Sequence, residues 1–187
     1  ANKKYAAETL QKDYAIFRNV LEESHPGIYW YTPKENMDRY FDLGKEQLKD
    51  SMTEPEFKKV LSYVISKINC GHTVVKNSKP YAKYLDTVRG KTFPFSVKIW
   101  PDTTVVAFNL QRKDSLTVRG SVIKKINGLP VEKIIDSLFQ FISTDGYNIT
   151  HKQQSLSNRG NFGSNFTSVF GEAEKYTVEF IDSNNKT

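Results

Sequence analysis

The sequence predicts an α+β protein, in which an N-terminal bundle of three helices precedes a small β-sheet or barrel domain that carries helices of its own. Before Asn69, apolar residues recur at the three- and four-residue spacing of amphipathic helices. After that point the period changes, and short runs of β-branched and aromatic residues alternate with turn residues. The Asn127-Gly128 pair follows one of these runs and favours a tight turn.

Composition indicates a globular chain and argues against two classes of protein. The chain has 187 residues, 38% of them hydrophobic, which suits one large domain or two small ones. The net charge is +6, but lysine and arginine are interspersed with acidic residues and form no basic run, so we do not expect nucleic-acid binding. The apolar runs are too short to cross a bilayer, so we expect no transmembrane segment in this chain.

The first two helices are predicted from spacing and from stop signals. Apolar residues share one helical face from Leu10 onward, and His25-Pro26-Gly27 ends that helix. The next four residues, 28–31, are aromatic and apolar, and we expect them to pack over the helices. A capping box at Thr32-Pro33-Lys34-Glu35 is predicted to begin the second helix.

The third helix has the clearest boundaries. Thr53 and Glu56 form a capping box, with a proline between them in the first turn. Asn69 and Gly71 can adopt the positive φ angles that end a helix, and residues 73–75 read as the start of an extended segment. We expect an exposed connector over residues 76–90.

The second half of the chain is expected to contain short strands, the turns between them and several helices. The predicted elements are strands at residues 93–100, 103–110, 121–126 and 176–181, a helix at 131–141 and short helices within 147–171. Pro101-Asp102 marks a hairpin between the first two strands. We place the helical module at residues 1–78 and the second domain at 79–187.

Cys70 and His72 are the strongest candidates for chemistry from residue type alone. Such a pair can be a nucleophile with its base, or two metal ligands. A zinc site needs about four ligands, and the other histidines, His25 and His151, lie in different predicted modules. We therefore favour a small buried apolar role for Cys70 and predict no metal site. A lone cysteine forms no intramolecular disulfide, so it does not report the compartment.

Motifs of known catalytic mechanics do not occur in the sequence. There is no Gly-x-Ser-x-Gly pentapeptide, no Gly-x-Gly-x-x-Gly and no Gly-x-x-x-x-Gly-Lys-Ser/Thr loop. We accordingly assign no catalytic residue and no cofactor, and we expect the chain by itself to hydrolyse no peptide.

The order of parts resembles the N-terminal region of C-terminal processing (tail-specific) serine peptidases, in the tricorn-like branch common in Bacteroidetes. The resemblance is carried by His25-Pro26-Gly27 after a helix and by Cys70-Gly71-His72-Thr73 at the end of another. Residues 120–131, with the Asn127-Gly128 turn, look like the strand, turn and helix start of the PDZ-like domain of those enzymes.

The resemblance implies that the catalytic residues lie in an α/β domain downstream of the PDZ-like domain. The loop composition after residue 181 suggests that the chain is cut inside a hairpin of a larger protein. Under this interpretation the residues that carry the resemblance have structural roles: His25, Pro26, Gly27, Cys70, Gly71, His72, Thr73, Asn127 and Gly128. The alternative for His72 is that it approaches the catalytic domain of the full-length enzyme. The resemblance also implies an exported protein, located in the periplasm, in the cell envelope or outside the cell after removal of its signal.

A PDZ-like domain implies a groove for peptide or unfolded protein C-termini beside the strand at residues 93–99. Gly90 permits close approach of a peptide backbone, and its neighbours could bind a carboxylate. The candidates are Arg89, Gly90 and Lys91 in the loop, with Phe93, Phe95, Ile134 and Leu138 as the apolar lining. The alternative is that the phenylalanines fill the core between sheet and helix. The sequence departs from a standard PDZ domain in two places. Residues 112–119 replace the small helix that usually precedes the next strand, and an insertion follows the long helix predicted at residues 131–141.

Three functions follow from this reading. The first is a non-catalytic N-terminal fragment of an exported serine peptidase that recognises or gates peptide substrate for its own catalytic domain. The second is a free-standing PDZ-like interaction or scaffold module. The third, less favoured, is nucleic-acid binding.

Overall fold

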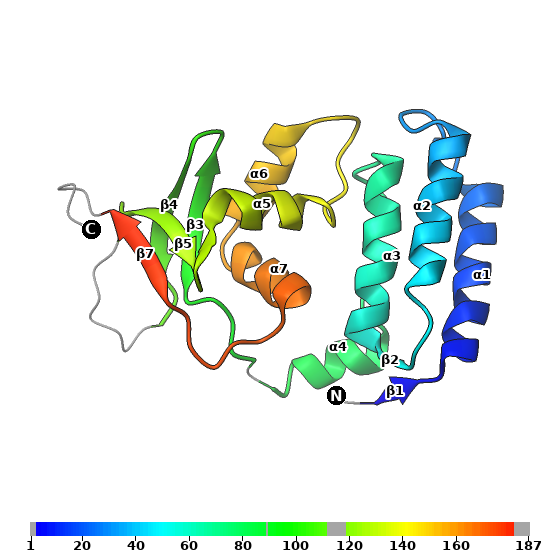
Figure 1. Ribbon diagram of the computed structural model, residues 1–187, viewed down its shortest axis with the longest axis horizontal. Helices are drawn as coiled ribbons and strands as arrows, with labels where there is room; N and C mark the ends of the chain where they lie inside the picture. Colours follow the sequence, from blue (N-terminus) through cyan, green and yellow to red (C-terminus); the bar gives the residue numbers. More distant parts are fainter. Residues whose placement is uncertain (1–2, 89, 112–118, 182–187) are drawn as a thin grey trace. The chain divides into compact units, whose positions relative to one another are not determined.

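A computed structural model describes residues 3–88, 90–111 and 119–181 of the chain (Figure 1). The predicted α+β fold class is confirmed, because helices come first and a small antiparallel sheet with further helices follows. The chain divides into two compact units, Ala1–Arg89 with Gln140–Asn148 and Gly90–Phe139 with Ile149–Thr187.

Three long helices build the first unit. They are α1 (Ala7–Ser24), α2 (Lys34–Glu46) and α3 (Glu54–Ile68), with the short α4 (Lys79–Leu85) and the two-residue strands β1 (Lys4–Tyr5) and β2 (Met52–Thr53). Their apolar faces meet in one core: Leu10, Tyr14, Leu21, Ile28, Met37, Phe41, Leu48, Val60, Val64, Ile65 and Ile68. Tyr14 spans this core, because its buried hydroxyl donates to the Phe41 carbonyl at 2.8 Å. The apolar spacing read from the sequence thus corresponds to the buried faces.

One of the two predicted capping boxes is confirmed. At the start of α3 the Thr53 amide donates to Glu56 Oε2 at 2.7 Å, and both halves of the box are formed. The box at Thr32 is wrong: α2 begins at Lys34, and Pro33 is its N-cap. The Thr32 hydroxyl instead donates to the carbonyl of Lys67. That carbonyl lies in the last turn of α3, where carbonyls accept from groups other than the helix's own amides, and Asn69 Nδ2 also donates to it at 3.3 Å. The tertiary contact thus outcompetes the local cap.

The segment after α3 also differs from its prediction. Asn69 has a positive φ of 56° and ends the helix as expected, whereas Gly71 does not adopt a positive φ. Residues 73–75 form no strand within the described chain. The predicted connector contains α4, whose first turn is capped by the Ser78 hydroxyl accepting from the Tyr81 amide at 3.2 Å.

The described residues of the second unit form a sheet of short antiparallel strands and three helices. The strands are β3 (Phe95–Trp100), β4 (Thr103–Asn109), β5 (Val122–Ile126), β6 (Leu129–Pro130) and β7 (Val178–Ile181), in the order β3-β4-β5-β6 with β7 also paired to β5. The helices are α5 (Val131–Phe139), α6 (Ile149–Ser157) and α7 (Asn161–Phe170). The hairpin at Pro101-Asp102 is confirmed by the pairing of Trp100 with Thr103.

The Asn127-Gly128 turn is confirmed by its backbone, with φ of 49° and 80° at the two residues. Both positive angles are those of a type I′ hairpin turn, which joins β5 to β6. Strand β6 leads directly into α5, whose apolar residues Val131, Ile134, Ile135 and Leu138 are buried.

Candidate functional site

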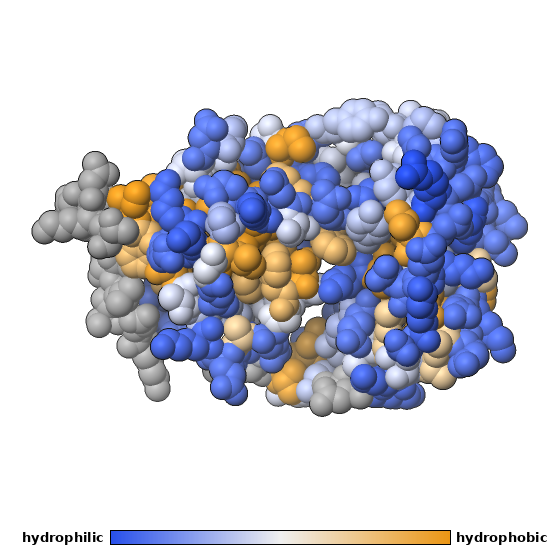
Figure 2. Space-filling view, in the orientation of Figure 1, coloured by the Kyte–Doolittle hydropathy of each residue, from blue (hydrophilic) through white to orange (hydrophobic). Residues whose placement is uncertain are grey.

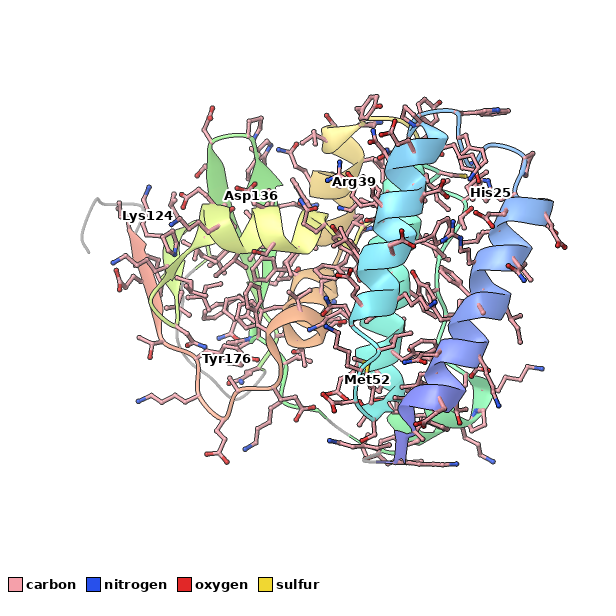
Figure 3. The ribbon with its side chains drawn as sticks, turned by 45° about the vertical axis from the view of Figure 1, so that its right-hand side comes forward. His25, Arg39, Met52, Lys124, Asp136 and Tyr176 are labelled. Atoms are coloured by element: carbon pink, nitrogen blue, oxygen red, sulfur yellow. The ribbon has the colours of Figure 1, made fainter. Side chains whose placement is uncertain are left out.

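A cavity of about 620 Å³ opens in the first unit where α1 ends. We call it the His25 pocket. It is built by three segments far apart in the sequence: the end of α1 with the residues that follow it, the turn after α3, and a loop that contains Asp145. It is lined by Val20, Leu21, Ser24, His25, Pro26, Gly27, Trp30, Tyr31, Cys70, His72, Thr73 and Asp145. Figure 3 shows His25 at the end of α1.

His25 connects the end of α1 to the turn after α3. The Gly27 amide donates to His25 Nδ1 at 3.2 Å, so in the neutral ring the proton is on Nε2. Nε2 lies 2.8 Å from Thr73 Oγ1, and the Thr73 hydroxyl in turn points to Cys70 Sγ at 3.5 Å. Both ring nitrogens are therefore engaged within the protein, and the chain of contacts holds two loops together.

The side chains of Cys70 and His72 do not face each other or a shared site. The half-buried Cys70 thiol faces Thr73, whereas the side chain of His72 is 90% exposed. Across the described ranges, no group of three or more His, Cys, Asp and Glu side chains is arranged to hold a metal ion.

His72 instead lies beside a carboxylate that the sequence did not indicate. Asp145 Oδ1 accepts the Gly71 amide at 2.7 Å, and Asp145 Oδ2 lies 3.8 Å from His72 Nε2. The hydrogen bond from the Gly71 amide holds the carboxylate in place, and the exposed imidazole ring lies beside it. An imidazole placed next to a carboxylate can accept and return a proton. No hydroxyl or thiol is hydrogen-bonded to His72 among the residues that the structure describes.

Exposed aromatic rings lie at the same end of the first unit. Trp30 lines the pocket with 75% of its surface exposed, so the expectation that the whole 28–31 segment packs over the helices is wrong for this residue. Ile28 belongs to the buried core and the half-buried Tyr29 packs against it, whereas Trp30 and Tyr31 are exposed. Tyr147 donates its hydroxyl to the Tyr31 carbonyl at 2.6 Å and closes the loop that carries Asp145.

The apolar residues expected to line a peptide groove are inside the second unit. Phe93, Phe95, Ile134 and Leu138 are all buried. Phe93 packs edge-on against Phe162 of α7, with ring centroids 5.3 Å apart. The phenylalanines thus fill the core, as the alternative interpretation held. Gly90 and Lys91 are exposed, and Arg89 lies outside the described residues.

The strand edge to which a PDZ peptide would add is covered in this chain. The N–H of Ile99, on the side of β3 away from β4, donates to Ser157 Oγ of α6 at 2.9 Å. Helix α6 belongs to the insertion that the sequence placed after the long helix. Backbone pairing of a ligand strand at Ile99 would need α6 to leave.

Together the parts define a class of fold: in chain order, a helical bundle and then a small antiparallel sheet with helices of its own. No helix in the described parts of the chain is long and apolar enough to cross a bilayer. No family model matches the chain. No curated protein matches it either.

Solved structures with this fold include CPAF, a chlamydial serine protease. The chain is similar to a CPAF mutant with a TM-score of 0.61, to mature CPAF with 0.56, and to mature CPAF complexed with lactacystin with 0.56. Each match is 12% identical in sequence and covers 96% of this chain. The chain spans about a third of the length of those chains, 32 to 33%. The likeness shows that the chain shares the fold of the matched part of CPAF.

Proposed function

We propose that this chain is the non-catalytic N-terminal region of an exported serine peptidase of the C-terminal processing, tricorn-like type. In this proposal it recognises or gates peptide substrate, including unfolded protein C-termini, for a catalytic domain elsewhere in the full-length protein. The single observation that carries the proposal is the likeness of fold to CPAF over 96% of the chain. The sequence motifs at the His25 pocket support the finer placement in the family.

The chemistry of the His25 pocket agrees with a supporting role. His25, Thr73 and Cys70 are engaged with one another, so they stabilise the meeting of two loops. The pair of His72 and Asp145 is exposed and could exchange a proton with a group supplied from outside this chain. Acyl transfer needs a hydroxyl or thiol within about 3 Å of the base, and none of the residues that the structure describes offers one hydrogen-bonded to His72.

Two measurements test the proposal. The first is to read the gene beyond Thr187, where we expect an α/β domain with a catalytic serine. The second is labelling with a fluorophosphonate probe, which reacts with activated serines. We expect the full-length protein to be labelled and the 187-residue chain to be unlabelled, and we expect the chain alone not to hydrolyse casein.

The results also decide between the candidate functions. A reading frame without such a domain, or a full-length protein that no serine probe labels, would support the free-standing interaction module instead. Labelling or turnover by the isolated chain that survives repurification and disappears in Cys70→Ala or His72→Ala would show that the chain is itself catalytic. The predicted export is tested separately, by fractionating cells that express the full-length protein.

A further inference from the structure

The second unit contains a groove whose charge is opposite to that of the chain. It has a volume of about 390 Å³ and lies between the β3–β4 hairpin, β5, α5 and α6. We call it the acidic groove. Its polar rim consists of Asp102, Lys124, Glu132 and Asp136, and its apolar side chains include Ile99, Trp100, Val131, Ile135, Phe139 and Ile149. Figure 3 shows Lys124 on β5 and Asp136 on α5.

Three carboxylates and one ammonium group give the rim a formal charge of −2, obtained as one minus three. The whole chain carries +6, so the local sign is reversed. None of these four side chains forms an ion pair among the described residues. Glu132 and Asp136 are four residues apart on α5, where two like charges repel. A cation bound in the groove would relieve that repulsion.

Apolar surface accompanies this charge. Trp100 and Ile149 are each 52% exposed and line the groove from the hairpin and from α6. In Figure 2 hydrophobic patches interrupt the hydrophilic surface around α5. An exposed indole next to carboxylates suits a guanidinium or ammonium group, because the ring face attracts a cation and the carboxylates accept its hydrogen bonds. The neighbouring apolar surface suits an aliphatic or aromatic side chain.

A peptide terminus is a poor fit for the same groove. Its carboxylate would meet Asp102, Glu132 and Asp136, which repel it. The backbone of β3 at Ile99 is occupied by Ser157, so a ligand cannot be held there by strand addition. Recognition in this groove therefore depends on side chains of the ligand and not on its terminus.

We propose that the acidic groove binds an extended peptide segment through an internal arginine or lysine next to an apolar residue. The inference deepens the proposed function, since it names the class of peptide that the second unit would select, and it rests on that function for its biological meaning. Binding itself can be measured without any catalytic domain.

The test uses the 187-residue chain labelled with ¹⁵N and three peptides of equal length. One is acetylated and amidated with a central arginine between leucines. The second has glutamate in place of the arginine. The third ends in leucine with a free carboxylate and has no basic residue. We expect the arginine peptide to shift the indole resonance of Trp100, assigned with Trp100→Phe, and the amides of α5. We expect the other two to cause no such shifts at the same concentration.

Charge variants give the sharper readout. Asp136→Asn and Glu132→Gln should each weaken binding of the arginine peptide about two- to fivefold, the effect of losing one exposed ion pair. Lys124→Gln should strengthen it by a similar factor, because it removes the only cation of the rim. Glu174→Gln, an exposed carboxylate of the same unit outside the groove, is the matched control and should change nothing. Added salt should weaken the arginine complex.

Several results would overturn the inference. Equal binding of the glutamate peptide, no binding of the arginine peptide at millimolar concentration, or indifference to all three rim variants would each do so. Selective binding of the free-carboxylate peptide would replace it with recognition of C-termini. The outcome of the serine-probe experiment does not depend on these results. If the groove binds no peptide but the full-length protein is labelled, the proposal of a peptidase still stands.

Discussion

Replacing Ser157 by alanine removes the acceptor that α6 offers to the backbone of β3. Ser157 Oγ lies 2.9 Å from the Ile99 nitrogen, and the two residues are only 4% and 6% exposed. In Ser157→Ala the Ile99 amide stays covered and loses its partner, which costs about 1–3 kcal/mol for a buried donor. The change removes one oxygen and leaves only a small cavity, so we expect the lost hydrogen bond to dominate.

The free energy of unfolding should be measured in urea by far-ultraviolet circular dichroism. We expect a lower midpoint with an unchanged slope. Hydrogen exchange at the Ile99 amide should accelerate together with its neighbours on β3, because the covering helix is less firmly attached. Ser168→Ala, at an exposed position of α7, is the control and should stay within about 0.5 kcal/mol of the parent chain.

Two results would refute the reasoning. If Ser157→Ala is as stable as the parent chain and the Ile99 amide is equally protected, the hydroxyl is not what satisfies this amide. If the variant instead gains affinity for the peptide with a free terminal carboxylate, the edge of β3 can bind peptide, and α6 blocks that edge in the parent chain.

Two further predictions concern the first unit. A Cβ on Gly44 would clash with the Tyr14 hydroxyl and lie 2.8 Å from Val64 Cγ2, so Gly44→Ala should lose about 1–3 kcal/mol to overpacking, less up to about 1 kcal/mol of helix propensity. Tyr14→Phe removes the clashing oxygen, and urea unfolding of the double variant should show a loss smaller than the sum of the single losses by about 0.5 kcal/mol or more; simple additivity would contradict the assigned clash. Hydrogen bonds from the Thr53 amide and hydroxyl lower the pKa of Glu56 from its ordinary 4.5. A lowered folded-state pKa contributes stability above the ordinary value that disappears as the pH falls through the lowered one. The stability gap between the parent chain and Glu56→Gln should therefore be full at pH 7 and close below pH 4.5, and a gap independent of pH would refute this origin.

Local patterns in the sequence determined most of the elements. The third helix could be placed from Thr53, Glu56 and Asn69, because caps and αL residues act within a few positions of themselves. The Asn127-Gly128 turn was predictable for the same reason, since its backbone angles follow from the two residues alone. These features belong to segments of four to fifteen residues, within which the competing conformations are few.

The candidate sites were decided by tertiary structure. Asp145 reaches Gly71 and His72 across more than 70 residues, a separation over which local sequence patterns carry no information. Thr32 has the spacing of a local cap, yet its hydroxyl donates to the carbonyl of Lys67, 35 residues away. In each case the contact joins segments far apart in the sequence, so it forms only once the helices have packed.

The same reasoning applies to the second unit. The sequence by itself determined that the run around Phe93 and Phe95 is apolar and extended, but not whether it faces a ligand or a core. Helix α7 supplied the covering surface through Phe162, and α6 supplied Ser157 for the edge at Ile99. An apolar side chain gains the same transfer free energy from any surface that removes it from water, so only the packing of distant elements could choose its partner.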